Sequence, residues 1–201
     1  KYDNQFIHVS TDEIYGDAYG QESFSEESQI NPSNPYAATK AAAEMLIFAY
    51  ARTFGIDYQI VRSTNNYGPR QYPEKLVPKI IHSLDNNEKI PLHGDGSYVR
   101  DWLYVKDNVS AIYKICQAKK LCEIWNVSAY NYMSNIEVVK KICDWKNIEN
   151  FMENVSFVED RMGQDYRYSI SSKKIRDALG WIPEKKDLFN FIDKIGEERN
   201  D

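Results

Sequence analysis

Three consecutive stretches decide the fold: FIHVSTDE (residues 6–13), PYAATKAAAEMLIFAYARTFG (35–55) and YQIVRS (58–63). The first is apolar and β-prone from Phe6 to Val9 and then turns polar, which is typical of a buried strand that presents side chains at its carboxyl end. The second opens with proline, is rich in alanine and stops at Gly55, as helices do. Strand, helix and strand in succession predict an α/β protein with a parallel sheet.

Further elements follow in the rest of the chain. Ser134 and Glu137 have the spacing of a capping box, and Asp107 is positioned to cap a helix that continues through Ile115. We expect a short strand over residues 125–128 and helices over 74–84, 136–144, 172–179 and 188–198.

Composition narrows the possible functions. The 201 residues are 42% hydrophobic, enough for the core of one domain or slightly more. The formal net charge of −5 is spread along the chain without a basic block, which disfavours nucleic acid as a partner. No run approaches the roughly 18 apolar residues of a membrane span, and no signal segment opens the chain.

The three cysteines give an odd count without a C-x-x-C pair or flanking histidines. This pattern argues against a disulfide framework and against a metal site, and it favours a cytoplasmic location. The chain opens with Lys1 instead of methionine and reaches core-like sequence within a few residues, so we expect it to be part of a larger protein.

Two residue groups could carry chemistry. Tyr36 and Lys40 share a helix face, where a nearby ammonium would lower the tyrosine pKa, although this spacing also occurs by chance. Thr11, Asp12 and Glu13 follow a strand at the edge where α/β sheets place functional groups. Two adjacent carboxyls there can act as acid and base, whereas the simpler alternative is a solvated loop or a helix cap made by Asp12.

Five motifs, taken together, resemble the nucleotide-sugar 4,6-dehydratases of the extended short-chain dehydrogenase/reductase family. They are HVSTDEIYGD (8–17), NPYAATKAAAEML (34–46), NNYGPRQYPEKLVPKII (65–81), IPLHGDGSYVRDWLYVKD (90–107) and DRMGQDYRYSI (160–170). They follow the family's order over nearly the whole chain. The related 4-epimerases share the Tyr and Lys but usually lack an Asp-Glu pair, and the decarboxylases have a different acid pattern, so Asp12 and Glu13 favour a dehydratase.

The resemblance implies a Rossmann-like doubly wound parallel sheet, with its N-terminal part missing from this chain, and a smaller C-terminal substrate-binding domain. Residues 1–80 would belong to the NAD-binding domain and residues 81–201 mainly to the substrate domain, with about 105–128 returning to the sheet.

The resemblance also implies a mechanism that uses NAD. Tyr36 would take the proton of the sugar 4-hydroxyl while hydride leaves C4 for NAD, and Lys40 would lower the tyrosine pKa and hold the nicotinamide ribose. Glu13 would then remove the C5 proton and Asp12 would protonate the departing 6-hydroxyl, after which the hydride returns to C6. Thr11 would hydrogen-bond the 4-oxygen.

Binding residues follow from the same resemblance. Tyr36, Lys40 and Asn66 would contact NAD. The residues expected to bind the nucleotide-diphosphate sugar are Thr11, Asn65, Lys75, Leu76, Pro91, His93, Arg100, Asn135, Arg161 and Gln164. Arginine forks suit phosphate oxygens, although Arg100 and Arg161 taken alone would equally suit surface salt bridges.

The chain departs from the family in two places. Gln164 stands where the family often has histidine, so it could donate a hydrogen bond but carry no charge. The Gly-rich turn that holds the NAD pyrophosphate is absent, because Gly94 and Gly96 lie too late in the chain to form it.

Several alternatives stay open at this point. The chain could belong to a 4-epimerase or decarboxylase, or to an inactive truncated protein that binds sugar nucleotides. The nucleotide base of the substrate could be thymine or uracil, since HGDGS resembles the UDP-glucose branch and RDWLYV resembles the dTDP-glucose branch. The family often forms homodimers through the helix that carries the tyrosine, so we expect a homodimer.

Overall fold

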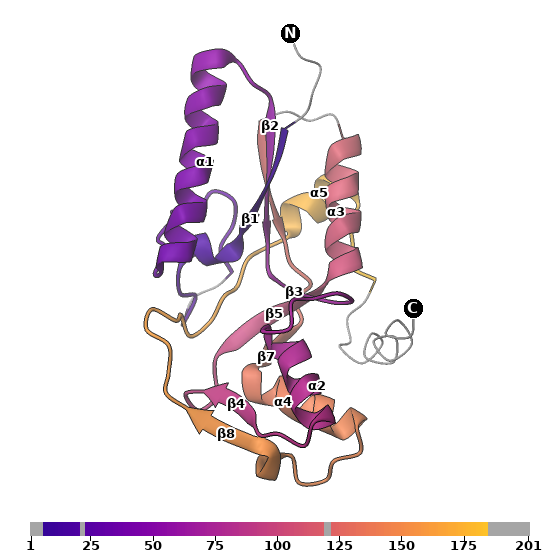
Figure 1. Cartoon of the computed structure of the whole chain (residues 1–201). Coiled ribbons are helices and arrows are strands. Elements are labelled where there is room, and N and C mark those ends of the chain that lie inside the picture. The colour runs from indigo at the N-terminus through magenta and orange to yellow at the C-terminus, as the bar shows by residue number, and fades with distance from the viewer. Residues whose placement is uncertain (1–5, 21–22, 119–121, 185–201) are drawn as a thin grey trace.

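The computed structural model describes residues 6–20, 23–118 and 122–184, and Figure 1 shows two parts stacked along the long axis of the molecule. The upper part holds a parallel sheet of β1 (Phe6–Thr11), β2 (Tyr58–Ser63) and β6 (Glu123–Val127), in the order β1-β2-β6. Because all three strands run the same way, their carboxyl ends meet at one edge of the sheet, which faces the lower part.

Helices cover both faces of this sheet. Helix α1 (Pro35–Phe54) lies on one face, and α3 (Val105–Gln117) with α5 (Lys173–Leu179) lies on the other (Figure 1). The layers confirm the predicted α/β class with a parallel sheet.

Helix α1 has clear signals at both ends. The Asn34 side chain accepts a hydrogen bond from the Ala37 amide, proline follows it at the first helical position, and Gly55 ends the helix in the left-handed conformation. The first turn of α1, which carries Tyr36, is therefore fixed by a neighbouring side chain.

The lower part combines short strands with two helices around a second core. Its elements are β3 (Asn65–Tyr67), α2 (Leu76–Asp85), β4 (Ile90–His93), β5 (Val99–Tyr104), β7 (Tyr132–Ser134), α4 (Asn135–Trp145), the 3-10 helix η2 (Phe151–Asn154) and β8 (Val155–Val158). Strand β5 pairs with β3 in parallel and with β7 antiparallel, and β4 pairs with β8. Apolar side chains of α2, α4 and β4, such as Ile80, Val138 and Leu92, form the core between them.

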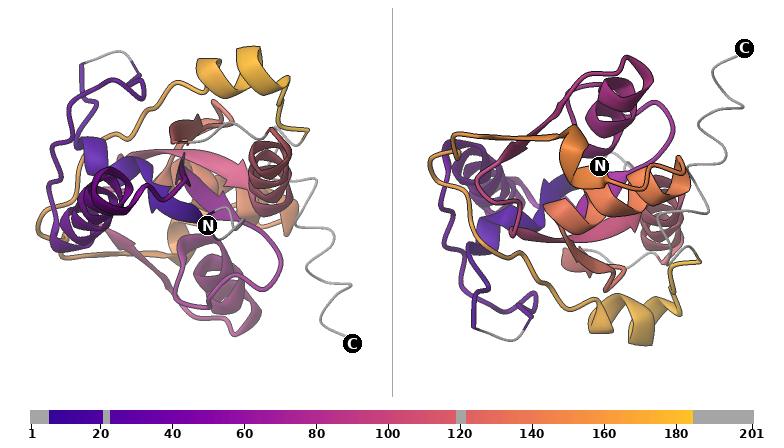
Figure 2. Two further views of the ribbon diagram at one scale, coloured as in Figure 1. Left: turned by 90° about the horizontal axis from the view of Figure 1, so that it is seen from above. Right: turned by 90° about the horizontal axis from the view of Figure 1, so that it is seen from below.

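One late segment joins the two parts. Residues 160–171 leave β8 and run back beside the segment that follows β1, as both views in Figure 2 show. Phe24 forms a bridge with Ile170, and an added Cβ on Gly163 would lie 3.2 Å from the Ser33 carbonyl oxygen. The DRMGQ motif is thereby held against the start of α1.

Most predicted elements are confirmed, with shifted ends. The Ser134 capping box is present, and α5 ends at Gly180. Helix α2 begins at Leu76, two residues later than expected. The prediction that Asp107 caps a helix is wrong: α3 begins at Val105, and Asp107 lies in its first turn.

Strand β1 is less buried than predicted. Phe6 is 46% exposed and Val9 47% exposed, because β1 pairs with β2 on one edge and with no other strand of the described residues.

The helix expected over 188–198 lies outside the described residues, and the domain limits stay a prediction. Within the described ranges, no helix has both the length and the apolar character needed to cross a bilayer.

Candidate functional site

The site begins where β1 ends. Thr11 is the last residue of β1 and caps the 3-10 helix η1 (Asp12–Tyr15), with its side chain accepting a hydrogen bond from the Glu13 amide at 3.3 Å. This tight turn directs two consecutive carboxyls differently, so that Asp12 is buried and Glu13 reaches a cavity.

Asp12 is held as a neutral acid. Burial, followed by the charges of Glu13 and Asp101, raises its pKa to about 8, and nearby Arg100 opposes the rise. Thr11 donates a hydrogen bond to Asp12 Oδ1 at 3.3 Å, while the buried Oδ2 atom has no partner. At neutral pH the carboxyl therefore retains a proton that it can give away.

Glu13 is oriented from two sides. Asn34 Nδ2 donates to Glu13 Oε2 at 3.2 Å, and the Tyr168 hydroxyl lies 3.5 Å from the same oxygen. Burial and then the charge of Glu13 raise the pKa of Tyr168, so its hydroxyl stays protonated. Asn34 thus caps α1 and holds the carboxylate with one side chain.

Tyr36 lies in the first turn of α1, beside Asp12 and Glu13. The residue is 54% exposed. Its pKa is raised by burial first and then by Glu13, while a hydrogen bond with Thr11 lowers it. Lys40 donates to the Val9 carbonyl oxygen at 2.6 Å. The expectation of a lowered tyrosine pKa is wrong for this arrangement, because the Lys40 ammonium donates to the backbone, while burial and the charge of Glu13 both raise the pKa of Tyr36.

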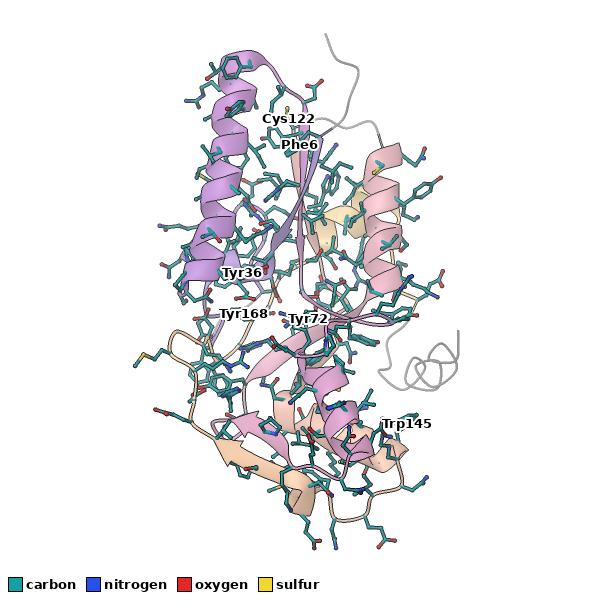
Figure 3. All side chains as sticks on the ribbon, viewed as in Figure 1. Phe6, Tyr36, Tyr72, Cys122, Trp145 and Tyr168 are labelled. Carbon is teal, nitrogen blue, oxygen red and sulfur yellow. The ribbon has the colours of Figure 1, made fainter. Side chains whose placement is uncertain are left out.

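A cavity of about 730 Å³ opens at the junction of the two parts, within the range of small-molecule sites. It is lined by Glu13, Asn34, Asn65, Pro73, Glu74, Lys75, Leu76, Lys79, His82, Pro91, Leu92, His93, Arg100, Trp102, Asn135, Arg161, Met162, Gly163, Gln164 and Tyr168. Figure 3 shows the labelled Tyr36, Tyr72 and Tyr168 at the level of this junction. The lining carries more positive than negative side chains, which suits an anionic ligand.

Arg100 is the most firmly held of the cations. It is 7% exposed, its guanidinium donates to the carbonyl oxygens of Val99, Asp165 and Tyr166, and it lies 4.4 Å from the centre of the Tyr168 ring. These contacts leave it at the cavity wall with a fixed orientation. The surface salt bridge considered as its alternative role does not describe this environment.

The cavity gathers the predicted substrate residues from six segments of the chain. Of that set only Thr11 does not line it; it lies beneath, next to Asp12. Asn65 lines the cavity, whereas Asn66, the next residue of β3, points elsewhere and has a buried Oδ1 atom without a partner. This alternation agrees with different ligand contacts for the two asparagines.

Sequence reasoning missed part of the lining. Asn34, Lys79, His82, Trp102 and Tyr168 were not predicted. Lys79 and His82 follow Lys75 by four and seven residues, so helical periodicity could have identified them. Nothing local marks Tyr168, because its contact with Glu13 joins residues 155 positions apart.

Comparisons with known proteins agree with this geometry. A family model described as GDP-mannose 4,6 dehydratase matches residues 1–190. A dTDP-glucose 4,6-dehydratase from Neisseria gonorrhoeae is 40% identical over 189 residues, which cover 89% of this chain and 55% of that protein. The low-salt glycan biosynthesis protein Agl12 from Haloferax volcanii is 41% identical over 181 residues, covering 90% of this chain and 57% of that protein.

A solved structure matches over nearly the whole chain. DesIV, a dTDP-glucose 4,6-dehydratase from Streptomyces venezuelae crystallised with NAD, superposes with a TM-score of 0.91 at 34% identity, covering 98% of this chain and 60% of that one. The chain thus spans a little over half the length of these proteins. The predicted relationship to nucleotide-sugar 4,6-dehydratases is confirmed, and the chain belongs to the GDP-mannose 4,6 dehydratase family, within the extended short-chain dehydrogenases/reductases.

Proposed function

We propose that this chain supplies the catalytic and sugar-binding residues for the NAD-dependent 4,6-dehydration of a nucleotide-diphosphate glucose to its 4-keto-6-deoxy product. One observation carries the proposal: two adjacent carboxyls, one kept protonated and one reaching the cavity, lie beside an accessible tyrosine. An oxidation alone needs only the tyrosine, whereas removal of water needs an acid and a base as well.

The residues divide the proton transfers among themselves. Tyr36 takes the proton of the 4-hydroxyl, and Thr11 holds the 4-oxygen. The 4-ketone makes the C5 hydrogen acidic, so that Glu13, oriented by Asn34, removes it as a proton. Asp12 donates its proton to the departing 6-hydroxyl, and water is lost.

The nicotinamide end of NAD fits the residues present. Lys40 and the unpartnered amide oxygen of Asn66 would hold it near Tyr36. When bound, NAD supplies a reversible hydride acceptor, so that the cofactor is not consumed. The 201-residue sequence contains no Gly-rich turn for the pyrophosphate, and we propose no residue of this chain for that group.

The substrate diphosphate is proposed to lie among Lys75, Arg100 and Arg161, with Asn65, Leu76, Pro91, His93, Asn135 and Gln164 completing the nucleotide site. Lys79 and His82 extend the same positively charged wall along α2. We take dTDP-glucose as the first candidate because curated relatives at about 40% identity bear that name. UDP-glucose is the alternative.

A homodimer formed through α1 is also proposed. The outward face of this helix exposes large apolar side chains, with Met45 48%, Leu46 62%, Tyr50 54% and Phe54 68% exposed. A helix stripe of this kind is typical of a buried interface. We also propose a cytoplasmic location, because an odd number of cysteines without a C-x-x-C pair is typical of proteins in a reducing compartment.

Product analysis tests the function. The protein containing this chain is incubated with NAD and, separately, with dTDP-glucose, UDP-glucose, GDP-mannose and the nucleotide-linked uronic acids that match the glucose substrates. The products are identified by mass spectrometry and NMR. We expect loss of one water and a 4-keto-6-deoxy sugar. An epimer of unchanged mass would indicate a 4-epimerase, loss of carbon dioxide from the matching uronic acid would indicate a decarboxylase, and binding without turnover would indicate an inactive relative.

A further inference from the structure

A buried ion pair lies between α1 and the sheet. Glu44 of α1 is fully buried and Arg62 of β2 is 2% exposed. Arg62 Nε donates to Glu44 Oε1 at 3.1 Å, and a terminal guanidinium nitrogen donates to Oε2 at 2.5 Å. The two contacts form a bidentate fork, which fixes direction as well as distance.

The remaining guanidinium nitrogen of Arg62 extends the network to η1, the 3-10 helix that contains Asp12 and Glu13. It donates to the Tyr15 hydroxyl at 2.5 Å, and that hydroxyl donates in turn to Asn126 Oδ1 at 2.8 Å. Burial first raises the pKa of Tyr15 to about 12, so the hydroxyl remains a donor. Tyr15 is 2% exposed and stacks on Phe24 with ring centres 5.4 Å apart.

The network links η1, which carries Asp12 and Glu13, to α1, which carries Tyr36 and Lys40. Tyr15 is the last residue of η1, two positions after Glu13. Glu44 follows Lys40 by one helical turn and Tyr36 by two turns on α1. Arg62 lies between them on β2, with Ser10 opposite it on β1 and Asn126 opposite it on β6. None of Arg62, Glu44 and Tyr15 lines the cavity.

We propose that Arg62 is a positioning residue, which sets the distance between the Asp12–Glu13 turn and the helix that carries Tyr36 and Lys40. The inference rests on the proposed function. One guanidinium holds α1 through Glu44 and η1 through Tyr15, so neither can shift without breaking a buried, charge-assisted hydrogen bond. An apolar contact at this place would tolerate sliding, whereas a fork of this kind does not.

The sharpest test removes the Tyr15 hydroxyl, which accepts from Arg62 and donates to Asn126. Tyr15→Phe deletes one hydroxyl, keeps the ring on Phe24 and leaves the Arg62–Glu44 pair intact. We expect kcat to fall about 10- to 100-fold with KM for the sugar nucleotide unchanged, because small displacements of catalytic groups have effects of this size. The fraction of reduced cofactor at steady state should rise, since η1 serves elimination whereas Tyr36 serves the first oxidation.

Gln59→Met is the matched control. Gln59 lies on the same strand, three residues before Arg62, and its Oε1 accepts a hydrogen bond from Trp125 Nε1 at 2.7 Å between two fully buried side chains. The variant therefore loses one buried side-chain hydrogen bond at the far end of β2. Its kcat and reduced-cofactor fraction should match the wild type.

A second variant separates positioning from stability. The double change Arg62→Met with Glu44→Leu replaces the pair by apolar side chains of similar size, a replacement that is often neutral or stabilising. We expect cooperative unfolding at or above the wild-type midpoint together with a kcat as low as that of Tyr15→Phe. Wild-type kcat in this double variant would overturn the proposal.

Hydrogen exchange distinguishes failure of this inference from failure of the proposed function. Without any substrate, peptides covering residues 12–16 should exchange faster in Tyr15→Phe than in Gln59→Met. Equal exchange in the two variants overturns the positioning role even if the wild type is active. A wild type that forms no dehydrated product overturns the proposed function and the catalytic role of the network. In that case the exchange result still shows whether the Tyr15 hydroxyl holds η1 in place.

Discussion

At the scale of single residues, one backbone turn places the neighbouring side chains of Asp12 and Glu13 in different environments. Asp12 and Glu13 are neighbours, yet the 3-10 turn after β1 buries the first and directs the second to the cavity. Desolvation keeps Asp12 protonated, while Asn34 provides Glu13 with a hydrogen-bond donor. A short segment can therefore present an acid and a base side by side.

Tyr36→Phe should nearly abolish turnover in the protein containing this chain while sugar-nucleotide affinity stays close to normal. The lost hydroxyl acts on the proton that moves in the transition state and contributes little to ground-state binding. Steady-state kinetics and calorimetry with dTDP-glucose measure the two quantities. Turnover at the wild-type rate would refute the assignment of Tyr36.

Glu13→Gln should permit the first oxidation and block elimination. The amide retains hydrogen bonds at this place but cannot accept the C5 proton, so reduced cofactor should accumulate without product. Absorbance of bound NADH after mixing with substrate follows the first step, and mass spectrometry follows the second. If water is lost at the normal rate, another residue is the base.

Asp12 should make both rate and stability depend on pH. Its pKa of about 8 in the folded protein, against 3.8 ordinarily, means that the native state holds a proton that the unfolded state has lost between these values. This group's contribution to stability therefore falls as pH rises toward about 8, and kcat should fall above about pH 8 as the acid ionises.

The neutral variant Asp12→Asn isolates this effect. Its melting temperature minus that of the wild type should increase between about pH 5 and about pH 8, since only the wild-type side chain titrates there. A difference that stays constant over this range would show that Asp12 is already ionised in the native protein.

At the scale of elements, helix starts fix the site. Asn34 caps the start of α1, two residues before Tyr36, and Ser134 caps the start of α4, next to Asn135, which lines the cavity. In each case a capping side chain determines where the first turn lies, and the first turn carries a site residue.

Ser134→Ala should lower the free energy of unfolding by about 1 kcal/mol, the usual cost of a lost N-cap. Its side chain accepts from the Glu137 amide, and Glu137 accepts from the Ser134 amide at 2.7 Å. Glu137→Gln keeps an acceptor for that amide and serves as the control, with a smaller loss. Urea unfolding of both variants provides the measurement, and an equal or larger loss in Glu137→Gln would contradict the larger contribution expected of the Ser134 hydroxyl.

At the scale of the whole molecule, the proposed sugar-nucleotide site is more complete in this chain than the proposed cofactor site. Predicted substrate residues from β3, α2, β4, β5, α4 and the DRMGQ segment surround one cavity. In contrast, Phe6 and Val9 are exposed on β1, one edge of which pairs with no strand of the described residues. Exposed apolar strand edges favour association, so the 201-residue chain alone should tend to aggregate.

The 201-residue chain alone should bind NAD weakly, because no Gly-rich turn and helix N-terminus are available to hold the pyrophosphate. It should bind the sugar nucleotide more tightly than NAD, since that cavity is lined by its own residues. Titration calorimetry with each ligand compares the two. Micromolar NAD binding, or dehydration by this chain alone, would contradict the expectation.

The sequence by itself determined the α/β class, the order of the main elements and the motifs whose residues line the cavity. Local signals suffice for these features: Asn34 before proline, Gly55 after an alanine-rich run, and the change from apolar to polar side chains at the end of β1 all act over a few residues. Only the tertiary structure decided the rest. It decided the contact of Tyr168 with Glu13, the hydrogen bonds of Arg62 to Glu44 and Tyr15, and the raised pKa of Tyr36. All of these depend on burial and on groups brought together from distant positions in the chain. Electrostatic energies follow distance in space and local desolvation, neither of which spacing along the chain can supply.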